Sequence, residues 1–210
     1  MIFTDRQDAG TRLAEECRRP GAAWQHPVVL GIPRGGVPVA APVADALNAP
    51  LDVIIVRKLG LPRNEEVAMG AIGEGVRVLD QDMVRTMGVI AEELQRIEFR
   101  ERAELERRVH AYREGRHPVA LAGATAVVVD DGLATGATAR AACAVARAQG
   151  AASVVLAVPV APPDWEPQPG VDADVFVCLA RPRGFFAIGQ WYNDFTQTTD
   201  AEVRELLAAD

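Results

Sequence analysis

Two carboxylates, a glycine-containing turn and two threonines lie close together in one short stretch of the chain. Residues Val127 to Thr138 read VVVDDGLATGAT, so three valines lead directly into Asp130 and Asp131. An apolar strand of this kind places its last side chains at the carboxyl end, where open α/β sheets bind ligands. The turn that follows presents backbone N–H groups at the start of a helix, which is a binding site for phosphate. The stretch therefore predicts a site for a phosphorylated sugar, with one carboxylate on each of two ribose hydroxyls.

Two other interpretations of this stretch are weaker. A bare Asp-Asp-Gly is typical of a turn with an N-capping aspartate before an ordinary helix. The complete string of strand, acidic pair, spacer and Thr-Gly-x-Thr favours the phosphate site, in which Thr135 and Thr138 add hydroxyl donors and Gly136 allows close approach. A nucleotide-binding P-loop is disfavoured because GxxxxGK[ST] is absent and this turn contains no lysine.

A second glycine-rich turn follows another apolar run. Val28 to Ile32 reads VVLGI, and Pro33, Arg34, Gly35 and Gly36 come directly after it. Glycines at the end of a strand offer N–H donors to an anion, and an arginine adds a charged bidentate fork. A simple strand-to-helix turn is the alternative. Arg57 and Lys58 likewise end a third apolar run, where they should face an anionic ligand or, alternatively, form a solvated charge pair.

The elements that must position these residues alternate between apolar runs and helical patterns. This alternation predicts a doubly wound parallel α/β sheet in a single domain of residues 1–210. The segment 59–75 is rich in glycine, proline and charge and is expected to be mainly a loop, with room for short strand segments. The expected strands are 28–32, 51–56, 125–129, 153–160 and 174–179, and the expected helices are 8–18, the segment up to Leu47, 89–113 and 137–148.

The composition excludes several classes of protein. The 210 residues are 49% hydrophobic and 24% charged, which is ordinary for a globular domain. The formal net charge of -7 disfavours non-specific nucleic-acid binding. Three widely spaced cysteines support neither a zinc site nor a disulfide framework. We see no secretory signal and no apolar stretch near the ~20 residues of a membrane span, so we expect a soluble cytoplasmic protein.

The stretch Val127 to Thr138 resembles the phosphoribosyl-pyrophosphate (PRPP) signature of the type I phosphoribosyltransferases. The resemblance implies that Asp130 and Asp131 hold the ribose hydroxyls. It also implies that the 5′-phosphate is bound by Ala134, Thr135, Gly136, Ala137 and Thr138.

The chain departs from the family pattern at two positions of this signature. Gly132 stands where the family usually has an apolar residue, which predicts a looser turn. Ala134 stands where the 6-oxopurine enzymes carry an aspartate and where adenine-type enzymes carry alanine. The resemblance therefore disfavours a hypoxanthine or guanine enzyme.

The two cationic segments resemble further parts of the same family. The Gly31 to Gly36 turn is similar to the pyrophosphate loop, where a non-proline cis peptide is common, and by analogy the bond is Pro33–Arg34. VRKLGLPRNEE resembles a segment of adenine phosphoribosyltransferases that opens a mobile catalytic loop, here about 59–75, although the lysine before Leu61 is lacking. By this analogy Arg57 and Lys58 face the pyrophosphate, Arg63 reaches it as it departs, and Glu65 and Glu66 are candidates for a carboxylate above the base.

Aromatic residues gather near the C-terminus of a chain that has few of them. The segment 185–192 loosely resembles the hood of purine-type enzymes, here placed at about 180–200, with Asn193, Asp194 and Phe195 about one residue out of register. Phe185 or Phe186 would give a flat heterocycle a stacking face, although packing in a core or subunit interface is the alternative. The helix at about 89–114 matches no family element and is interpreted as a lid or dimer surface.

The resemblance implies transfer of a 5-phosphoribosyl group from PRPP to a nitrogenous base, with release of pyrophosphate, as in purine salvage. Mg²⁺ is the expected cofactor, with Asp130 and Asp131 as its protein ligands beside the substrate oxygens. The expected partners are PRPP, a small base and a second copy in a homodimer, with neither nucleic acid nor membrane. Two alternatives stay open: a regulatory protein that binds PRPP without catalysis, and a hydrolase of a phosphoribosyl compound. The expected catalytic residues are Arg57, Lys58, Glu65 and Glu66, and the expected substrate-binding residues are Arg34, Gly35, Gly36, Asp130, Asp131, Ala134 to Thr138, Phe185 and Phe186.

Overall fold

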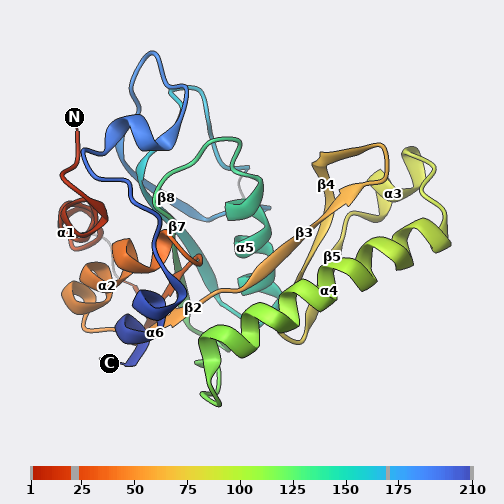
Figure 1. The fold of residues 1–210 in the computed structure, drawn as a ribbon, viewed down its shortest axis with the longest axis horizontal. Coiled ribbons are helices and arrows are strands. Elements are labelled where there is room, and N and C mark those ends of the chain that lie inside the picture. The colour runs from red at the N-terminus through yellow and green to blue at the C-terminus, as the bar shows by residue number, and fades with distance from the viewer. Residues whose placement is uncertain (1, 20–23, 169–170, 209–210) are drawn as a thin grey trace.

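A five-stranded parallel sheet forms the centre of the molecule (Figure 1). The computed structural model describes residues 2–19, 24–168 and 171–208. The strand order is β2-β1-β6-β7-β8, and every neighbouring pair is parallel, which confirms the expected α/β fold class. The strands are β1 (Pro27–Gly31), β2 (Leu51–Val53), β6 (Thr125–Val129), β7 (Ser153–Val160) and β8 (Val175–Ala180).

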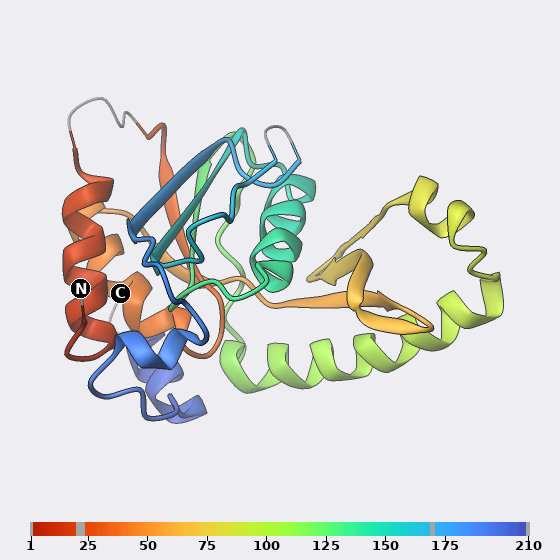
Figure 2. The same ribbon diagram turned by 90° about the horizontal axis from the view of Figure 1, so that it is seen from above.

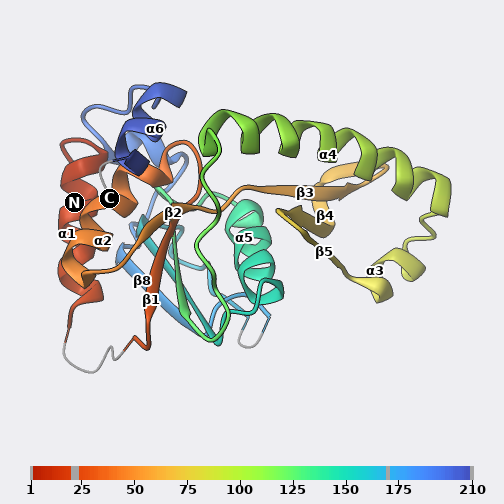
Figure 3. The same cartoon turned by 90° about the horizontal axis from the view of Figure 1, so that it is seen from below.

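Helices cover both faces of this sheet, which explains why its inner strands are continuous apolar runs rather than alternating ones. Val127 and Val129 of β6 face a core shared with α1, α2 and α6, while Val128 faces a second core shared with α5. The figures show α1 and α2 on one side of the sheet and α5 on the other (Figure 1, Figure 3). The helices are α1 (Arg6–Cys17), α2 (Gly36–Leu47), α5 (Ala137–Ala148) and α6 (Asp200–Ala208). Helix α6 was not predicted from the sequence.

Residues 56–113 form an arm that projects from the sheet, as Figure 2 shows. The arm contains a three-stranded antiparallel sheet of order β3-β4-β5 and the long helix α4, which confirms the helix expected at 89–113. Its elements are β3 (Val56–Leu61), β4 (Asn64–Gly73), β5 (Val76–Leu79), α3 (Gln81–Thr86) and α4 (Ala91–Arg113). No helix within the described ranges is long and apolar enough to cross a membrane.

Two expectations about the arm are wrong. The strand expected over 51–56 ends at Val53, and Val56 already begins the antiparallel sheet. The segment 59–75, expected to be mainly a loop, consists largely of the paired strands β3 and β4. Its glycine content suggested a loop, but a Cβ on Gly73 would lie 2.4 Å from Val145 Cγ1 of α5. Glycine therefore allows β4 to pack closely against the core.

A buried ion-pair cluster joins the end of α4 to the central sheet. Arg113, 8% exposed, donates to the Asp52 carboxylate of β2 at 2.6 Å and to Glu74, which follows β4, at 2.7 Å. Asp52, 4% exposed, also accepts hydrogen bonds from the backbone N–H groups of Val53 and Val119. One guanidinium thus connects the central sheet, the arm sheet and α4.

Candidate functional site

The glycine-rich turn after β1 and the acidic pair after β6 lie against each other. The two strands are direct neighbours at the sheet centre, so their carboxyl ends lie side by side. A Cβ on Gly35 would lie 2.0 Å from Asp131 Oδ2, and one on Gly36 would lie 2.5 Å from the Val129 carbonyl oxygen. The two turns can therefore meet only because both positions are glycine. The peptide bond Pro33–Arg34 is cis, as the analogy predicted.

Asp131 is held by Arg6, at the start of α1. The Arg6 Nε and Nη2 atoms both lie 2.9 Å from Asp131 Oδ2, and Nη1 donates to the Thr196 carbonyl. The Asp131 carbonyl in turn accepts a hydrogen bond of 2.6 Å from the Tyr192 hydroxyl. Neither Arg6 nor Tyr192 was predicted from the sequence to take part in the site.

Burial disfavours the ionised form of both carboxyl groups of the acidic pair. Burial raises the pKa of Asp130 well above its usual range, and the charge of neighbouring Asp131 raises it further. Burial also raises the pKa of Asp131, although the ion pair with Arg6 opposes that rise. Asp130 accepts one hydrogen bond of 2.9 Å from the Asp131 backbone N–H. The acidic pair is thus a concentrated, partly compensated negative charge that suits hydroxyl donors or a cation.

The expected phosphate loop leads directly into α5. Gly136 caps that helix with a φ of 76°, a left-handed conformation that favours glycine. It lies against the indole of Trp165, which donates from Nε1 to the Thr135 carbonyl at 3.2 Å. The first-turn N–H groups of an α-helix have no partner inside the helix, so this terminus can receive a phosphate. Trp165 was missed because 30 residues separate it from Thr135 in the sequence.

The variant Gly136→Ala is expected to lose free energy of unfolding and affinity for ribose 5-phosphate. Alanine at a positive φ costs about 1 kcal/mol, and the new Cβ would also lie 2.3 Å from Trp165 Nε1. Gly123→Ala is the matched control, because Gly123 has a φ of 74° and open space around the added Cβ. Urea unfolding and calorimetric titration would measure both. Equal losses of stability in the two variants would show that the Trp165 contact is not important.

A cleft of about 610 Å³ opens beside the acidic pair and the glycine-rich turn. Tyr112, Arg107 and Arg108 of α4 form part of its wall, so the arm helix reaches the site. Asp200 of α6 accepts a hydrogen bond of 2.9 Å from the Tyr112 hydroxyl and lies 3.7 Å from Arg34 Nη1. Figure 3 shows α6 beside the core end of α4. The other lining residues are Arg6, Pro33, Gly35, Asp131, Phe195, Gln197 and Thr198.

The candidates on the arm are not brought into this cleft. Arg57 pairs with Glu101 of α4 at 2.6 Å, and that glutamate is 6% exposed. The expectation that both cations end a sheet strand is wrong, because β3 continues through Arg57 and Lys58. Successive side chains of a strand point to opposite faces, so the two cations cannot share one direction. Glu65 is exposed and pairs with Arg100 at 3.1 Å.

The remaining arm candidates add little to the site. Lys58 is half-buried and takes part in interactions of its own. Arg63 lies exposed in the turn between β3 and β4. The Glu66 side chain lies outside the part that the structure describes.

The hood packs on the acidic turn. A Cβ on Gly132 would lie 2.7 Å from Ile188 Cγ2, so this departure from the family pattern makes room for the hood rather than loosening the turn. Phe185 packs against the small core of Phe3 and Tyr192, whereas Phe186 is 89% exposed. Of the two candidate stacking rings, Phe186 is therefore the available one.

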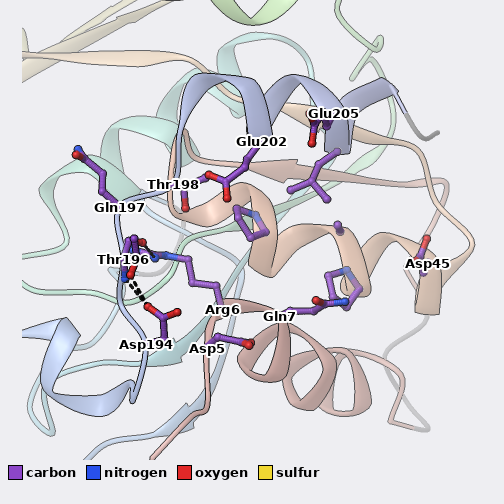
Figure 4. A pocket seen from close by; sticks show the side chains of 14 residues that line it. Asp5, Arg6, Gln7, Asp45, Asp194, Thr196, Gln197, Thr198, Glu202 and Glu205 are labelled. Atoms are coloured by element: carbon purple, nitrogen blue, oxygen red, sulfur yellow. Dashed lines mark hydrogen bonds between the residues drawn. The ribbon is translucent and has the colours of Figure 1, made fainter.

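A second cleft, of about 550 Å³, is also lined by Arg6 (Figure 4). Figure 4 shows Asp194 bonded to Thr196, with Arg6 beside them and Glu202 and Glu205 on the helix above. Arg6 is the one cation among the described residues that line it, against five carboxylates. Such a wall repels a polyphosphate, so the arginine-rich cleft is the better place for one. The five are Asp5, Asp45, Asp194, Glu202 and Glu205.

The chain is similar to known proteins over most of its length. Residues 3–187 match the family model described as phosphoribosyl transferase domain. A Mycobacterium tuberculosis protein, provisionally named a phosphoribosyl transferase, is 54% identical over 207 residues, which are 98% of this chain and 46% of that protein. The chain thus spans about half the length of the curated relatives it matches.

Two crystal structures share the fold. That of TT1426 from Thermus thermophilus superposes with a TM-score of 0.91 and 42% identity, covering 100% of this chain and 99% of that one. A Neisseria gonorrhoeae protein with bound ppGpp gives a TM-score of 0.52 and 15% identity, covering 100% and 98%. The second likeness concerns the fold alone.

Proposed function

The chain belongs to the phosphoribosyl transferase domain family, and we propose on this premise that it transfers the 5-phosphoribosyl group of PRPP to a nitrogenous base. One observation carries the proposal. The glycine-rich turn after β1 and the acidic pair after β6 touch each other beside an arginine-lined cleft. PRPP has a phosphate at one end, a pyrophosphate at the other and ribose hydroxyls between them. It therefore needs two neighbouring anion sites, with groups between them that accept hydrogen bonds from the hydroxyls.

The proposed roles follow from the position of each turn. The phosphate loop, Ala134 to Thr138, binds the 5′-phosphate at the start of α5. Asp130 and Asp131 accept hydrogen bonds from the ribose hydroxyls. Arg34 and the N–H groups of Gly35 and Gly36 bind the pyrophosphate.

The reaction breaks the bond between C1′ and the pyrophosphate and forms a bond from C1′ to a ring nitrogen. C1′ gains oxocarbenium-like charge in such glycosyl transfers. The chain contributes by fixing the ribose, by stabilising the charge that develops on the departing pyrophosphate, and by limiting access of water. Arg34 is the guanidinium best placed for the second task.

The acidic pair also fits Mg²⁺, which is commonly bound by one or two carboxylates together with substrate phosphates. Because Asp131 is paired with Arg6, Asp130 is the first candidate ligand and Asp131 the second. The described residues contain no cluster of three or more metal-binding side chains, so substrate oxygens would complete the coordination. When bound, the ion neutralises charge on the donor.

The arm residues can act in this reaction only if the arm moves. Arg57 and Glu65 are bound to α4 in the structure, so their proposed catalytic roles, and those of Lys58, Arg63 and Glu66, require the β3–β4 hairpin to approach the cleft. Closure of such a segment would exclude water and prevent hydrolysis of the donor. The core residues carry the proposal without it.

We propose a purine-type base as the acceptor. Ala134 places no carboxylate in the phosphate loop, which disfavours 6-oxopurines, and the exposed ring of Phe186 offers a stacking face. We further propose a homodimer located in the cytoplasm, acting without nucleic acid or membrane partners.

One assay tests the function. The protein is incubated with PRPP, Mg²⁺ and a panel of purine, pyrimidine and pyridine bases, and release of pyrophosphate is measured. Release that depends on one base supports transfer, whereas release without any base would identify a hydrolase. Stabilisation by PRPP without turnover under any condition would identify a regulatory binding protein instead.

Phe186→Ala is expected to raise the KM for the base several-fold without changing the free energy of unfolding. The ring buries little surface in the protein, so its removal affects only stacking, which contributes about 0.5–1.5 kcal/mol. Phe99→Ala on α4 is the matched control, because its ring is 79% exposed and does not belong to the hood. Steady-state kinetics with the active base provides the measurement. An unchanged KM in the Phe186 variant would remove this residue from the acceptor site.

A further inference from the structure

Helix α4 presents two adjacent arginines to the cleft of the glycine-rich turn. Arg107 and Arg108 lie in its last two turns and line the same cleft as Arg34 and Asp131. Both are held by Glu104 of the same helix, through contacts of 2.8 Å each. Those contacts lower the pKa of Glu104 to about 2, so this carboxylate is ionised throughout the neutral range. The pair is thus already ordered by a neighbouring anion.

The charges around the Tyr112 hydroxyl show that these side chains converge with the turn after β1. Burial and the Asp200 carboxylate raise the pKa of Tyr112, while the positive charges of Arg108 and Arg34 oppose that rise. Arg34 reaches this point from the central sheet and Arg108 from the arm, so two separate parts of the fold surround it. Glu104 raises the pKa of Arg107, and the charge of Asp200 adds to that rise.

The cleft contains more positive than negative charge. Four arginines line it, from two helices and one turn, against two carboxylates in the lining. Glu104 pairs with Arg107 and Arg108 from outside this lining. Of the two lining carboxylates, Asp131 is already paired with Arg6. The other, Asp200, lies 3.7 Å from Arg34 Nη1, and its side chain is 40% exposed. An external anion with several oxygens would make stronger contacts with this set than one carboxylate at 3.7 Å does.

We propose that Arg107 and Arg108 of α4 form the second wall of the pyrophosphate subsite, and that the incoming pyrophosphate displaces Asp200 from the cleft. The inference rests on the proposed function, since it concerns one end of the same donor. It gives the arm helix a role in binding the leaving group, in place of the lid or dimer surface expected from the sequence. The arm then selects donors that carry a pyrophosphate at C1′.

Calorimetric titrations with two separate probes, inorganic pyrophosphate and ribose 5-phosphate, test this assignment in the presence of Mg²⁺. The double variant Arg107→Gln/Arg108→Gln is expected to bind pyrophosphate at least about tenfold more weakly, since each hydrogen bond to a charged group is worth that much or more. Its affinity for ribose 5-phosphate should stay within about twofold of wild type, because the phosphate loop and the acidic pair are unchanged. Arg96→Gln/Arg102→Gln is the matched control, since both arginines are exposed on α4 outside the cleft.

Asp200→Asn separates binding from a purely structural role of the two arginines. Asparagine can still accept the Tyr112 hydrogen bond, but it removes the competing charge, so pyrophosphate should bind several-fold more tightly. Unchanged pyrophosphate affinity in both variants, or equal weakening of both probes in the arginine variant, would overturn the proposal. Wild-type protein that binds ribose 5-phosphate but not pyrophosphate would overturn it and leave the donor site standing. Binding of neither probe by wild type would instead contradict the proposed function itself.

Discussion

The double variant Asp130→Asn/Asp131→Asn is expected to lower kcat/KM for phosphoribosyl transfer by about a thousandfold. In the proposed complex each carboxylate accepts a hydrogen bond from a ribose hydroxyl, and a hydrogen bond to a charged group contributes about 1.5–3 kcal/mol. Two such losses correspond to roughly two to four orders of magnitude. Calorimetric titration with PRPP gives a second measurement that does not depend on turnover, and the affinity for the donor should fall as well.

The two single variants should differ in stability. Asp131→Asn leaves the Arg6 guanidinium, whose side chain is 11% exposed, without its counter-ion, which should cost about 1–3 kcal/mol of the free energy of unfolding. Asp130→Asn removes a buried charge beside Asp131, so the free energy of unfolding should stay the same or rise. Both variants should nevertheless bind the donor more weakly than the wild type does. A loss of activity by Asp130→Asn at full stability would therefore indicate a binding role rather than a folding role.

Asp82→Asn is the matched control, because its carboxylate is exposed on α3 of the arm and should leave both measurements unchanged. The decisive result would be donor affinity that stays at the wild-type value in the double variant. In that case the acidic pair would not bind the ribose, and the site would have to lie elsewhere along the cleft.

The local parts of the site could be predicted because their signals are contiguous in the sequence. The strands Thr125–Val129 and Ser153–Val160 and the helix Ala137–Ala148 have the bounds expected from apolar runs and turn residues. Continuous apolar strands are typical of a sheet covered on both faces, so the fold class followed from the same runs. Adjacent parallel strands then bring the two turns together, as the topology requires.

The side chains that complete the site gave no such signal. Arg6 lies 125 residues from its partner Asp131 and resembles any other arginine of an amphipathic helix. Arg107 and Arg108 belong to a helix crowded with charges, and only the way α4 docks on the core distinguishes them from neighbours outside the cleft such as Arg102. Long-range packing decides these contacts, and a local pattern does not encode it.

The arm shows the opposite error, in which a local signal was misleading. Glycine, proline and charge in residues 59–75 indicated a loop, although β4 is a ten-residue strand. Glu101, a charged residue in the middle of α4, is buried against Arg57. Both features make sense only when the arm sheet and α4 are packed together. The contacts between the arm sheet and α4 could therefore not be predicted from local patterns in the sequence.

Arg113→Met is expected to lower the free energy of unfolding by about 3–5 kcal/mol, because removing one partner of a buried ion pair leaves an uncompensated buried charge. Here two carboxylates, Asp52 and Glu74, lose the same guanidinium. For a chain of this size the melting temperature should fall by roughly 10 °C. Urea unfolding and calorimetry would measure the change, with Arg102→Met as the exposed control on the same helix.

Neutralising the two carboxylates as well separates the effect of unpaired charge from the effect of lost packing. The triple variant Arg113→Met/Asp52→Asn/Glu74→Gln contains no unpaired charge at this point, so it should recover a large part of the lost stability. Asparagine at position 52 can still accept from the N–H groups of Val53 and Val119. A triple variant no more stable than Arg113→Met would show that charge is not the cause. The cluster also joins α4 to the central sheet. If the triple variant is stable but binds pyrophosphate more weakly than the wild type, the cluster also positions Arg107 and Arg108 in the cleft.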